Sequence, residues 1–251
     1  MYHKPVLLKE AVQLLNIRPD GIYVDATYGS GGHSRAIMEQ LGSGRVIAFD
    51  QDPDAAANAM DDSRFTLIRQ NFRYMKNFLR IEGVDSVDGI LADLGISSWQ
   101  IDQASRGFST RLDGTLDMRM DSQQELQAGM VVNDYSEEEL ADLFYHYGEI
   151  ENSRALAREI VSKRKEKRIR TTSALVEISA RFAPRGKENQ YLARVFQAIR
   201  IEVNEELEAL REMLRQSPEL LQAGGRIVVI SYHSLEDKVV KNFFNTGNFE
   251  G

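Results

Sequence analysis

The stretch Tyr23-Val24-Asp25-Ala26-Thr27-Tyr28-Gly29-Ser30-Gly31-Gly32-His33-Ser34 has the pattern of a strand, a glycine-rich turn and the start of a helix. Residues 22–24 favour a β-strand, and Ser34 can cap a helix that continues to Leu41. Glycines between a strand and a helix let backbone N–H groups approach a ligand closely. The stretch therefore predicts a nucleotide-binding loop after the first strand of an α/β fold.

The spacing of the glycines separates two classes of nucleotide site. The dinucleotide fingerprint G-x-G-x-x-G would require glycine at position 34, where this chain has serine, so pyrophosphate binding is disfavoured. The pattern found here is an acid, three residues and G-x-G, with Asp25 at the strand end. It resembles the first motif of S-adenosylmethionine (SAM) methyltransferases, and a carboxylate suits the cationic ammonium and sulfonium of SAM. A plain glycine turn in an unrelated α/β protein is the alternative.

The composition is that of an ordinary globular protein of 251 residues, with 42% hydrophobic residues and a formal net charge of −7. The absence of cysteine excludes disulfides, thiolate zinc sites and cysteine nucleophiles. No apolar run approaches the roughly 20 residues of a membrane span, and no secretory signal opens the chain. We therefore expect a cytoplasmic protein without membrane association. The net charge argues mildly against non-specific coating of nucleic acid.

Three further apolar segments end beside an acidic or aromatic residue: 45–49 before Asp50, 65–69 before Phe72, and 87–92 before Asp93. Ligands of open α/β sheets collect at the carboxyl ends of the strands, so these residues are candidates for a cofactor site. Asp50 lies 18 residues after Gly32, about where a second strand delivers a carboxylate to ribose hydroxyls. For Phe72 a place in the core is equally consistent with the pattern.

The alternation of strands and helices stops at about residue 104 and resumes near residue 200. The clearest helix between them opens with a capping box formed by Ser136 and Glu139. A turn at Pro218 and Gly224-Gly225 then precedes a last strand and a final helix. The other predicted elements are helices at 5–15, 54–60, 152–165, 173–182 (capped by Thr172) and 189–214, and the last strand at 226–231.

Short motifs follow one another along almost the whole chain. They are His3-Lys4-Pro5-Val6-Leu7-Leu8, Asp25-Ala26-Thr27, Gly31-Gly32-His33-Ser34, Asp50-Gln51-Asp52-Pro53, Asp93-Leu94-Gly95-Ile96-Ser97-Ser98, Arg106-Gly107-Phe108-Ser109, Leu116-Asp117-Met118-Arg119-Met120-Asp121, Tyr147-Gly148-Glu149, Phe196-Gln197-Ala198-Ile199-Arg200-Ile201 and Ser231-Tyr232-His233-Ser234-Leu235-Glu236-Asp237. Singly most are weak, but jointly and in this order they are specific. The chain resembles the MraW (RsmH) family of methyltransferases.

The resemblance implies an enzyme that uses SAM to methylate the exocyclic N4 amine of a cytidine in 16S ribosomal RNA of the small ribosomal subunit. We predict an α/β fold, a doubly wound Rossmann-like methyltransferase sheet with an inserted all-helical domain. The sheet domain is discontinuous, covering 1–104 and 201–251. The insertion, 105–200, is expected on the RNA side. No metal is expected, and a homodimer is left open.

The resemblance also implies a set of cofactor residues, of which His33 and Gln100 rest on it alone. The set overlaps the strand-end residues found from spacing, so the two lines of reasoning support the same cofactor site. Its members are Gly31, Gly32, His33, Asp50, Phe72, Asp93 and Gln100.

The proton acceptor needs separate reasoning, because the cytosine amine is a poor nucleophile whose lone pair is delocalised into the ring. A nearby group must hold an amine hydrogen and later receive the proton. Asp93 and Ser97 lie at the right strand end, and His233 follows the last strand, so these three are the catalytic candidates. For His233 a structural role at a helix start is the alternative.

The chain departs from the family in three places, one of which is Tyr191-Leu192-Ala193, where members often have His-Pro-Ala. Ser98-Trp99-Gln100 stands where members often have Ser-Ser-Pro-Gln. Members also usually continue some tens of residues further with a basic tail, which leaves a truncated form open. A non-catalytic RNA-binding ribosome assembly factor on the same fold is therefore the alternative function, and a nucleotide-binding dehydrogenase is a second one. The basic run 163–170 could hold phosphates or be a solvated helix end.

Overall fold

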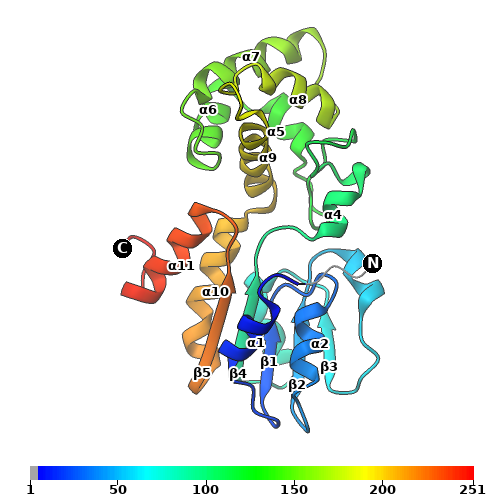
Figure 1. Ribbon diagram of the computed structural model, residues 1–251, viewed down its shortest axis with the longest axis vertical. Coiled ribbons are helices and arrows are strands. Elements are labelled where there is room, and N and C mark those ends of the chain that lie inside the picture. The colour runs from blue at the N-terminus through cyan, green and yellow to red at the C-terminus, as the bar shows by residue number, and fades with distance from the viewer. Residues whose placement is uncertain (1–4) are drawn as a thin grey trace. The chain divides into compact units, whose positions relative to one another are not determined.

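The computed structural model describes residues 5–251, so the His3-Lys4 part of the first motif lies outside the described residues. The chain forms two compact units, which are drawn in Figure 1. The first comprises the chain up to Gly95 together with Leu207–Gly251, and the second comprises Ile96–Glu206. Along the chain, the boundaries between the two units fall at 95/96 and 206/207. The boundaries predicted from the sequence are 104/105 and 200/201.

The first unit is built on one parallel sheet with the strand order β3-β2-β1-β4-β5. The first three strands step outwards in one direction and the last two in the other, so the order reverses between β1 and β4. This is a doubly wound α/β fold, as predicted. The strands are β1 (Ile22–Asp25), β2 (Arg45–Phe49), β3 (Phe65–Ile68), β4 (Val87–Asp93) and β5 (Leu221–Ile230).

Helices cover both faces of this sheet, and the alternation of side chains along β1 shows why. Tyr23 is buried on one face with α1 (Leu8–Leu15) and α2 (Gly32–Met38). Val24 is buried on the opposite face with α3 (Met75–Ile81) and α10 (Glu206–Leu220). Successive residues of a strand point to opposite faces, so a strand covered on both sides must be apolar throughout.

Two predictions for the first unit were wrong in detail. The segment 54–60 forms a short 3₁₀ helix, η1 (Pro53–Asn58), in which the side chain of Asp52 accepts from Asp54 N at 3.1 Å. Ser34 does not cap α2, because the helix already begins at Gly32 after Gly31 in the left-handed conformation. Ser34 is instead buried inside the first turn of the helix.

The predicted turn before the last strand was also wrong. Pro218 lies inside α10, and β5 begins at Leu221 rather than at 226. Gly224, with φ +84°, lies inside the strand. The register against β4 shifts between Val87 and Gly89, and this irregularity accommodates the extra residues of β5.

The second unit is helical, and its residues 96–206 contain no strand, only an isolated bridge between Thr115 and Thr171. The predicted capping box is confirmed, since Ser136 and Glu139 exchange side-chain and backbone hydrogen bonds. Within residues 5–251, no helix combines the length and the apolar character needed to cross a membrane. The helices are α4 (Ser98–Asp102), η3 (Ala104–Arg106), α5 (Ala128–Asp134), α6 (Glu137–His146), α7 (Ser153–Glu166), α8 (Thr172–Ala180) and α9 (Glu188–Asn204).

Two helix ends in the second unit differ from the prediction. The cap of α8 is Thr171, whose side chain accepts from Ala174 N, so Thr172 is the first residue of the helix. The long helix predicted at 189–214 is broken at Glu205, which has φ +49° and separates α9 from α10. An amphipathic pattern that continues in phase across the break cannot reveal it.

Asn204 fixes the end of α9 from the inside. Its Oδ1 accepts from Met120 N at 2.7 Å, and its Nδ2 donates to Met118 O at 2.8 Å and to Arg200 O at 2.9 Å. The side chain is only 5% exposed, so all three bonds lie in a poorly solvated place. Met118, with φ +59°, is thereby held against the helix end.

We expect Asn204→Ala to lower the free energy of unfolding by about 2–3 kcal/mol, because it removes three hydrogen bonds made by a buried side chain to the backbone of Met118, Met120 and Arg200. Urea denaturation followed by circular dichroism measures this change. Asn77→Ala, at an exposed position of α3, is the matched control and should leave the stability within about 0.5 kcal/mol. An Asn204→Ala protein as stable as the control would show that water replaces these bonds.

Candidate functional site

The carboxyl ends of the five strands lie at one edge of the sheet, and Asp25, Asp50 and Asp93 lie at or just after three of these ends. In the register, Asp25 of β1 lies between Ala48 of β2 and Leu91 of β4. The residues that follow these strands are therefore neighbours. The reversal of strand order between β1 and β4 opens a crevice at this edge in doubly wound sheets, and ligands bind there.

Asp25 lies at the centre of this edge but faces inwards. It is fully buried, and its carboxylate accepts from Ser34 Oγ at 2.6 Å and from Thr27 N at 3.1 Å. Burial raises the pKa of Asp25, and the bond from Ser34 opposes that rise. The aspartate therefore ties the start of α2 to the end of β1, and it is not exposed to a ligand.

The three glycines of the loop have different reasons to be glycine. A Cβ at Gly31 would lie 2.6 Å from Tyr28 Oη, and a Cβ at Gly32 would collide with the ring of Pro5. Both glycines thus allow close packing within the chain. Gly29 has φ +54° and nothing within 4 Å of the place a Cβ would take, so its Cβ side is open. Gly29 is the first glycine of the G-x-G pattern in the sequence, but the cofactor set predicted from the sequence contains only Gly31 and Gly32.

Asp50 follows β2 and connects it to the glycine loop. Its Oδ2 accepts from Gly29 N at 2.7 Å, and its Oδ1 accepts from Asp52 N at 2.8 Å. Burial raises the pKa of Asp50 to about 6, although these two bonds favour the ionised form. The carboxylate is therefore held in a fixed orientation beside the loop.

Phe72 begins the short helix η2 (Phe72–Tyr74) after β3. Asn71 caps that helix by accepting from Arg73 N at 2.9 Å, and its amide donates to Gln51 Oε1 at 2.8 Å. The ends of β2 and β3 are therefore linked. The ring of Phe72 is partly buried and packs against the hydrophobic cluster that includes Met75 and Leu79 of α3, so part of it contributes to the fold.

His33 and Asp93 approach each other from α2 and β4. His33 is 5% exposed, and its Nε2 lies 3.2 Å from Val6 O, which can only accept, so Nε2 carries a hydrogen. Its Nδ1 is 3.7 Å from Asp93 Oδ2. The backbone N of Asp93 donates to Thr27 Oγ1 at 2.7 Å, which connects β4 to the residues after β1.

Tyr232, which sequence reasoning did not select, completes the surroundings of Asp93. Its hydroxyl donates to Asp93 Oδ1 at 2.7 Å from the connection between β5 and α11 (Ser234–Thr246). The signal was present in the sequence, because Tyr232 follows a strand end just as Asp50, Phe72 and Asp93 do.

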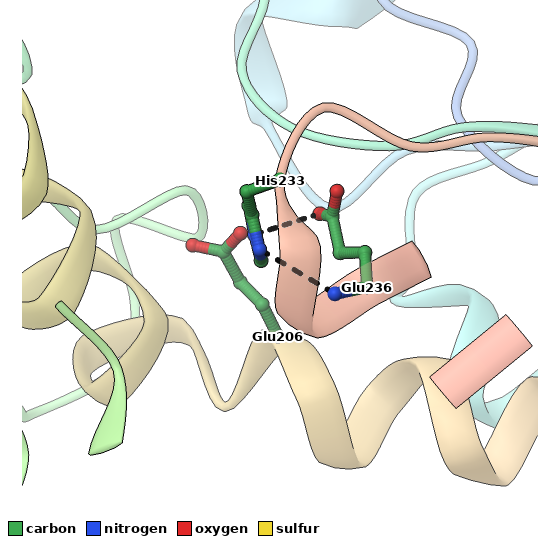
Figure 2. Close-up of side chains that lie close together, drawn as sticks. All are labelled: Glu206, His233 and Glu236. Carbon is green, nitrogen blue, oxygen red and sulfur yellow. Dashed lines mark hydrogen bonds and ion pairs between the residues drawn. The ribbon is translucent and has the colours of Figure 1, made fainter. Parts of the chain in front are cut away.

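His233 is the N-cap of α11. Its Nδ1 accepts from Glu236 N at 3.4 Å, and its Nε2 is 3.2 Å from Glu236 Oε1, as the dashed lines in Figure 2 show. Nε2 is buried and has no hydrogen bond of good geometry among the described residues. Glu206, also labelled in Figure 2, forms an ion pair with Arg200 at 2.8 Å. The imidazole of His233 is thus oriented by the helix that it caps.

Two further site candidates, Ser97 and Gln100, belong to the second unit. Together they form a capping box at the start of α4, in which Gln100 N donates to Ser97 Oγ at 3.2 Å and Ser97 N donates to Gln100 Oε1 at 3.0 Å. Gln100 is buried. Both side chains therefore stabilise the helix end in this structure.

The basic run 163–170, at and after the end of α7, is less available than its sequence suggests. Lys163 pairs with Glu166 at 3.2 Å, and Arg168 pairs with Asp134 at 2.9 Å. Arg164 donates to Val132 O at 3.0 Å. Half of the run is thus engaged in contacts within the second unit, which favours a solvated, partly neutralised helix end.

A pocket of about 560 Å³ lies in the second unit between the residues after α4 and one side of α9. Phe108 and Phe196 supply aromatic walls, and Arg111, Gln197 and Ser109 supply polar groups. This mixture of aromatic surface with a few hydrogen-bonding groups is typical of small-molecule and nucleobase sites.

The family model described as the MraW methylase family matches residues 1–249. The chain is 56% identical over its full length to the ribosomal RNA small subunit methyltransferase H of Cytophaga hutchinsonii, covering 85% of that protein. It is 55% identical to the protein of the same name from Flavobacterium johnsoniae, covering 83% of it. A solved structure described as a putative rRNA-methylase from Clostridium thermocellum matches with a TM-score of 0.33, 19% identity and coverage of 47% of this chain and 74% of that one, too distant to add support.

Full-length identity above one half to these relatives and a family match over residues 1–249 agree with the doubly wound sheet and its polar edge. The chain belongs to the MraW methylase family and is a SAM-dependent methyltransferase.

Proposed function

We propose that this chain transfers the methyl group of SAM to the exocyclic N4 amine of a cytidine in 16S ribosomal RNA of the small ribosomal subunit, in the cytoplasm. The family match and the names of the relatives support the class of reaction and the substrate. The observation that carries the proposal is the pair of carboxylates, Asp50 and Asp93, fixed beside an open glycine loop at the reversal of strand order.

The residues present fit SAM. Gly29 and Gly31 have positive φ and form a loop whose Cβ side is open at Gly29. Asp50 offers an oriented carboxylate to the ribose hydroxyls, and Asp93 offers another to the cationic amino acid end. The remaining cofactor residues of the proposal in the first unit are Gly32, His33 and Phe72. SAM supplies the methyl group on a sulfonium, and positioning of the two reactants can contribute about 7–11 kcal/mol to the rate.

Among the three candidates for the proton acceptor, the geometry favours Asp93. The Nδ1 lone pair of His233 accepts from Glu236 N, so taking up a proton there would remove the cap of α11. The Ser97 hydroxyl is similarly engaged as the cap of α4. A carboxylate has several acceptor positions, so Asp93 can hold an amine hydrogen while it keeps the bond from Tyr232.

The second unit is proposed to take the RNA side. Its pocket presents Phe108 and Phe196 with Arg111, which suits a splayed base and its phosphate. The basic run 163–170 contributes less to this proposal than expected, because Lys163 and Arg168 are paired with acids.

Labelled SAM incubated with small ribosomal subunits from a strain lacking the endogenous activity tests the function directly. We expect label in RNA, and nucleoside analysis should identify N4-methylcytidine. A parallel reaction with naked 16S RNA shows whether the substrate is the assembled subunit or the free RNA. Binding of particles without transfer of label would support the assembly-factor alternative instead.

SAM affinity should depend on pH through Asp50. Hydroxyl donors bind the ionised carboxylate, and the pKa of Asp50 is raised to about 6, so SAM should bind more weakly as the pH falls below this value. The dissociation constant should approach a tenfold rise per pH unit, measured by calorimetry from pH 5 to 7.5.

Asp50→Asn is the matched variant for this experiment, since it keeps the shape and removes the titration. Its SAM affinity should be lower at pH 7.5 and flat over the same range. A pH dependence that survives in Asp50→Asn would belong to another group, such as the buried Asp25, whose pKa is also raised by burial.

The roles of Asp93 and His233 can be separated by single-turnover methylation at saturating SAM. We expect Asp93→Asn to lower the rate by about 10²–10⁴, the usual range for a proton acceptor. His233→Asn retains an N-cap acceptor for α11 and should lower the rate by roughly threefold or less. The opposite order of losses would assign the proton to His233.

A further inference from the structure

Tyr232 lies in the short connection between β5 and α11, beside the carboxyl end of β4. Asp93 is paired with Ile230 in the parallel register, and Leu94 N donates to Ile230 O at 3.0 Å. The chain segments that leave the two strands are therefore adjacent. From this position the Tyr232 hydroxyl donates to Asp93 Oδ1 at 2.7 Å.

Tyr232 is itself held at two points. Its backbone N donates to Oε2 of Glu236 at 2.8 Å, and Glu236 is only 2% exposed. Its ring packs against Gly95, where φ is +95° and an added Cβ would lie 3.3 Å from Tyr232 Cδ2. The hydroxyl is thus delivered to Asp93 by a side chain with little freedom to move.

The position of Tyr232 is not that of a core residue, since 52% of it is exposed. A ring so exposed contributes little to the stability of the sheet. Burial of the hydroxyl and its bond to Asp93 raise the pKa of Tyr232, so the group remains protonated and a donor at neutral pH. What the tyrosine adds at this place is one hydrogen bond to a carboxylate.

We infer that Tyr232 is a positioning residue for methyl transfer, whose hydroxyl fixes the orientation of the Asp93 carboxylate at the site. The inference rests on the proposed function. Rotation about the terminal bond of an aspartate is soft, and a bond to Oδ1 removes that freedom. With Oδ1 held by Tyr232, Oδ2 stays on the side of His33, 3.7 Å from Nδ1.

The test is Tyr232→Phe, which keeps the ring against Gly95 and removes the hydroxyl. We expect a loss of roughly 10- to 100-fold, the range for one hydrogen bond to a charged group. The loss should appear in SAM affinity if Asp93 holds the cofactor, and in the single-turnover rate at saturating SAM if it orients the amine. The thermal midpoint should stay that of the wild type.

A pH profile gives a readout that a purely structural role would not move. Loss of a donor to Asp93 disfavours its ionised form, so the acidic limb of the single-turnover rate should shift to higher pH in Tyr232→Phe. The titratable groups near this pair, Asp25 on β1, His33 on α2 and Glu236 on α11, are unchanged in the variant.

Tyr74→Phe is the matched control, because Tyr74 is also about half exposed in the same unit and its hydroxyl has no hydrogen bond to the described residues. Its SAM affinity and rate should equal those of the wild type. Tyr232→Phe should have no further effect in an Asp93→Ala background, where the acceptor of the tyrosine hydroxyl is gone, because the two residues act through one bond.

Two results would overturn the inference: wild-type SAM affinity and rate in Tyr232→Phe, or an equal loss with and without Asp93. Failure of the proposed function is a separate outcome, in which the wild type binds SAM but transfers no methyl group to RNA. In that case the double-mutant cycle between Tyr232 and Asp93, measured in SAM affinity, tests the role of Tyr232 independently. The absence of coupling between the two residues in this cycle also overturns the inference.

Discussion

The buried carboxylate of Asp25 is the interaction on which the rest of the site depends. A carboxylate removed from water is costly unless hydrogen bonds replace its hydration, and here Ser34 Oγ and Thr27 N supply them. These two bonds hold the start of α2 and the residues after β1 in one arrangement. Thr27 then accepts from Asp93 N, so the position of β4's last residue follows from the same carboxylate.

Most hydrogen bonds of the site consequently join a side chain to a backbone N–H group, and few join two side chains. Gly29 N donates to Asp50, so the glycine loop and the end of β2 share a bond. Tyr232 brings the residues after β5 to Asp93. Donors and acceptors fixed in this way need no reorganisation when a ligand binds, which is the condition for strong electrostatic stabilisation at a site.

The sequence predicted this edge well because strand ends are determined by local pattern. An apolar run followed by Asp50 or Asp93 can be read without knowing the fold, and parallel topology brings such ends together. Side-chain partners depend on tertiary placement, so the inward turn of Asp25 and the bond from Tyr232 could not be predicted. The break at Glu205 was missed because the buried bonds of Asn204, which hold the end of α9, join residues more than 80 positions apart in sequence.

The glycine loop shows that a motif can identify the position of a candidate site although some of its glycines are required by packing within the chain and not by a ligand. Gly31 and Gly32 leave room for Tyr28 and Pro5, so any side chain there would disturb the packing of the chain itself. Gly29 alone combines positive φ with open space at its Cβ side, and its N–H is already directed at Asp50. Gly31 and Gly32 thus allow the loop to pack against the rest of the chain. Gly29 leaves the surface of the loop accessible beside the Asp50 carboxylate. The sequence motif does not distinguish a glycine required for close packing from a glycine required for an open loop surface. The packing around each Cα makes this distinction.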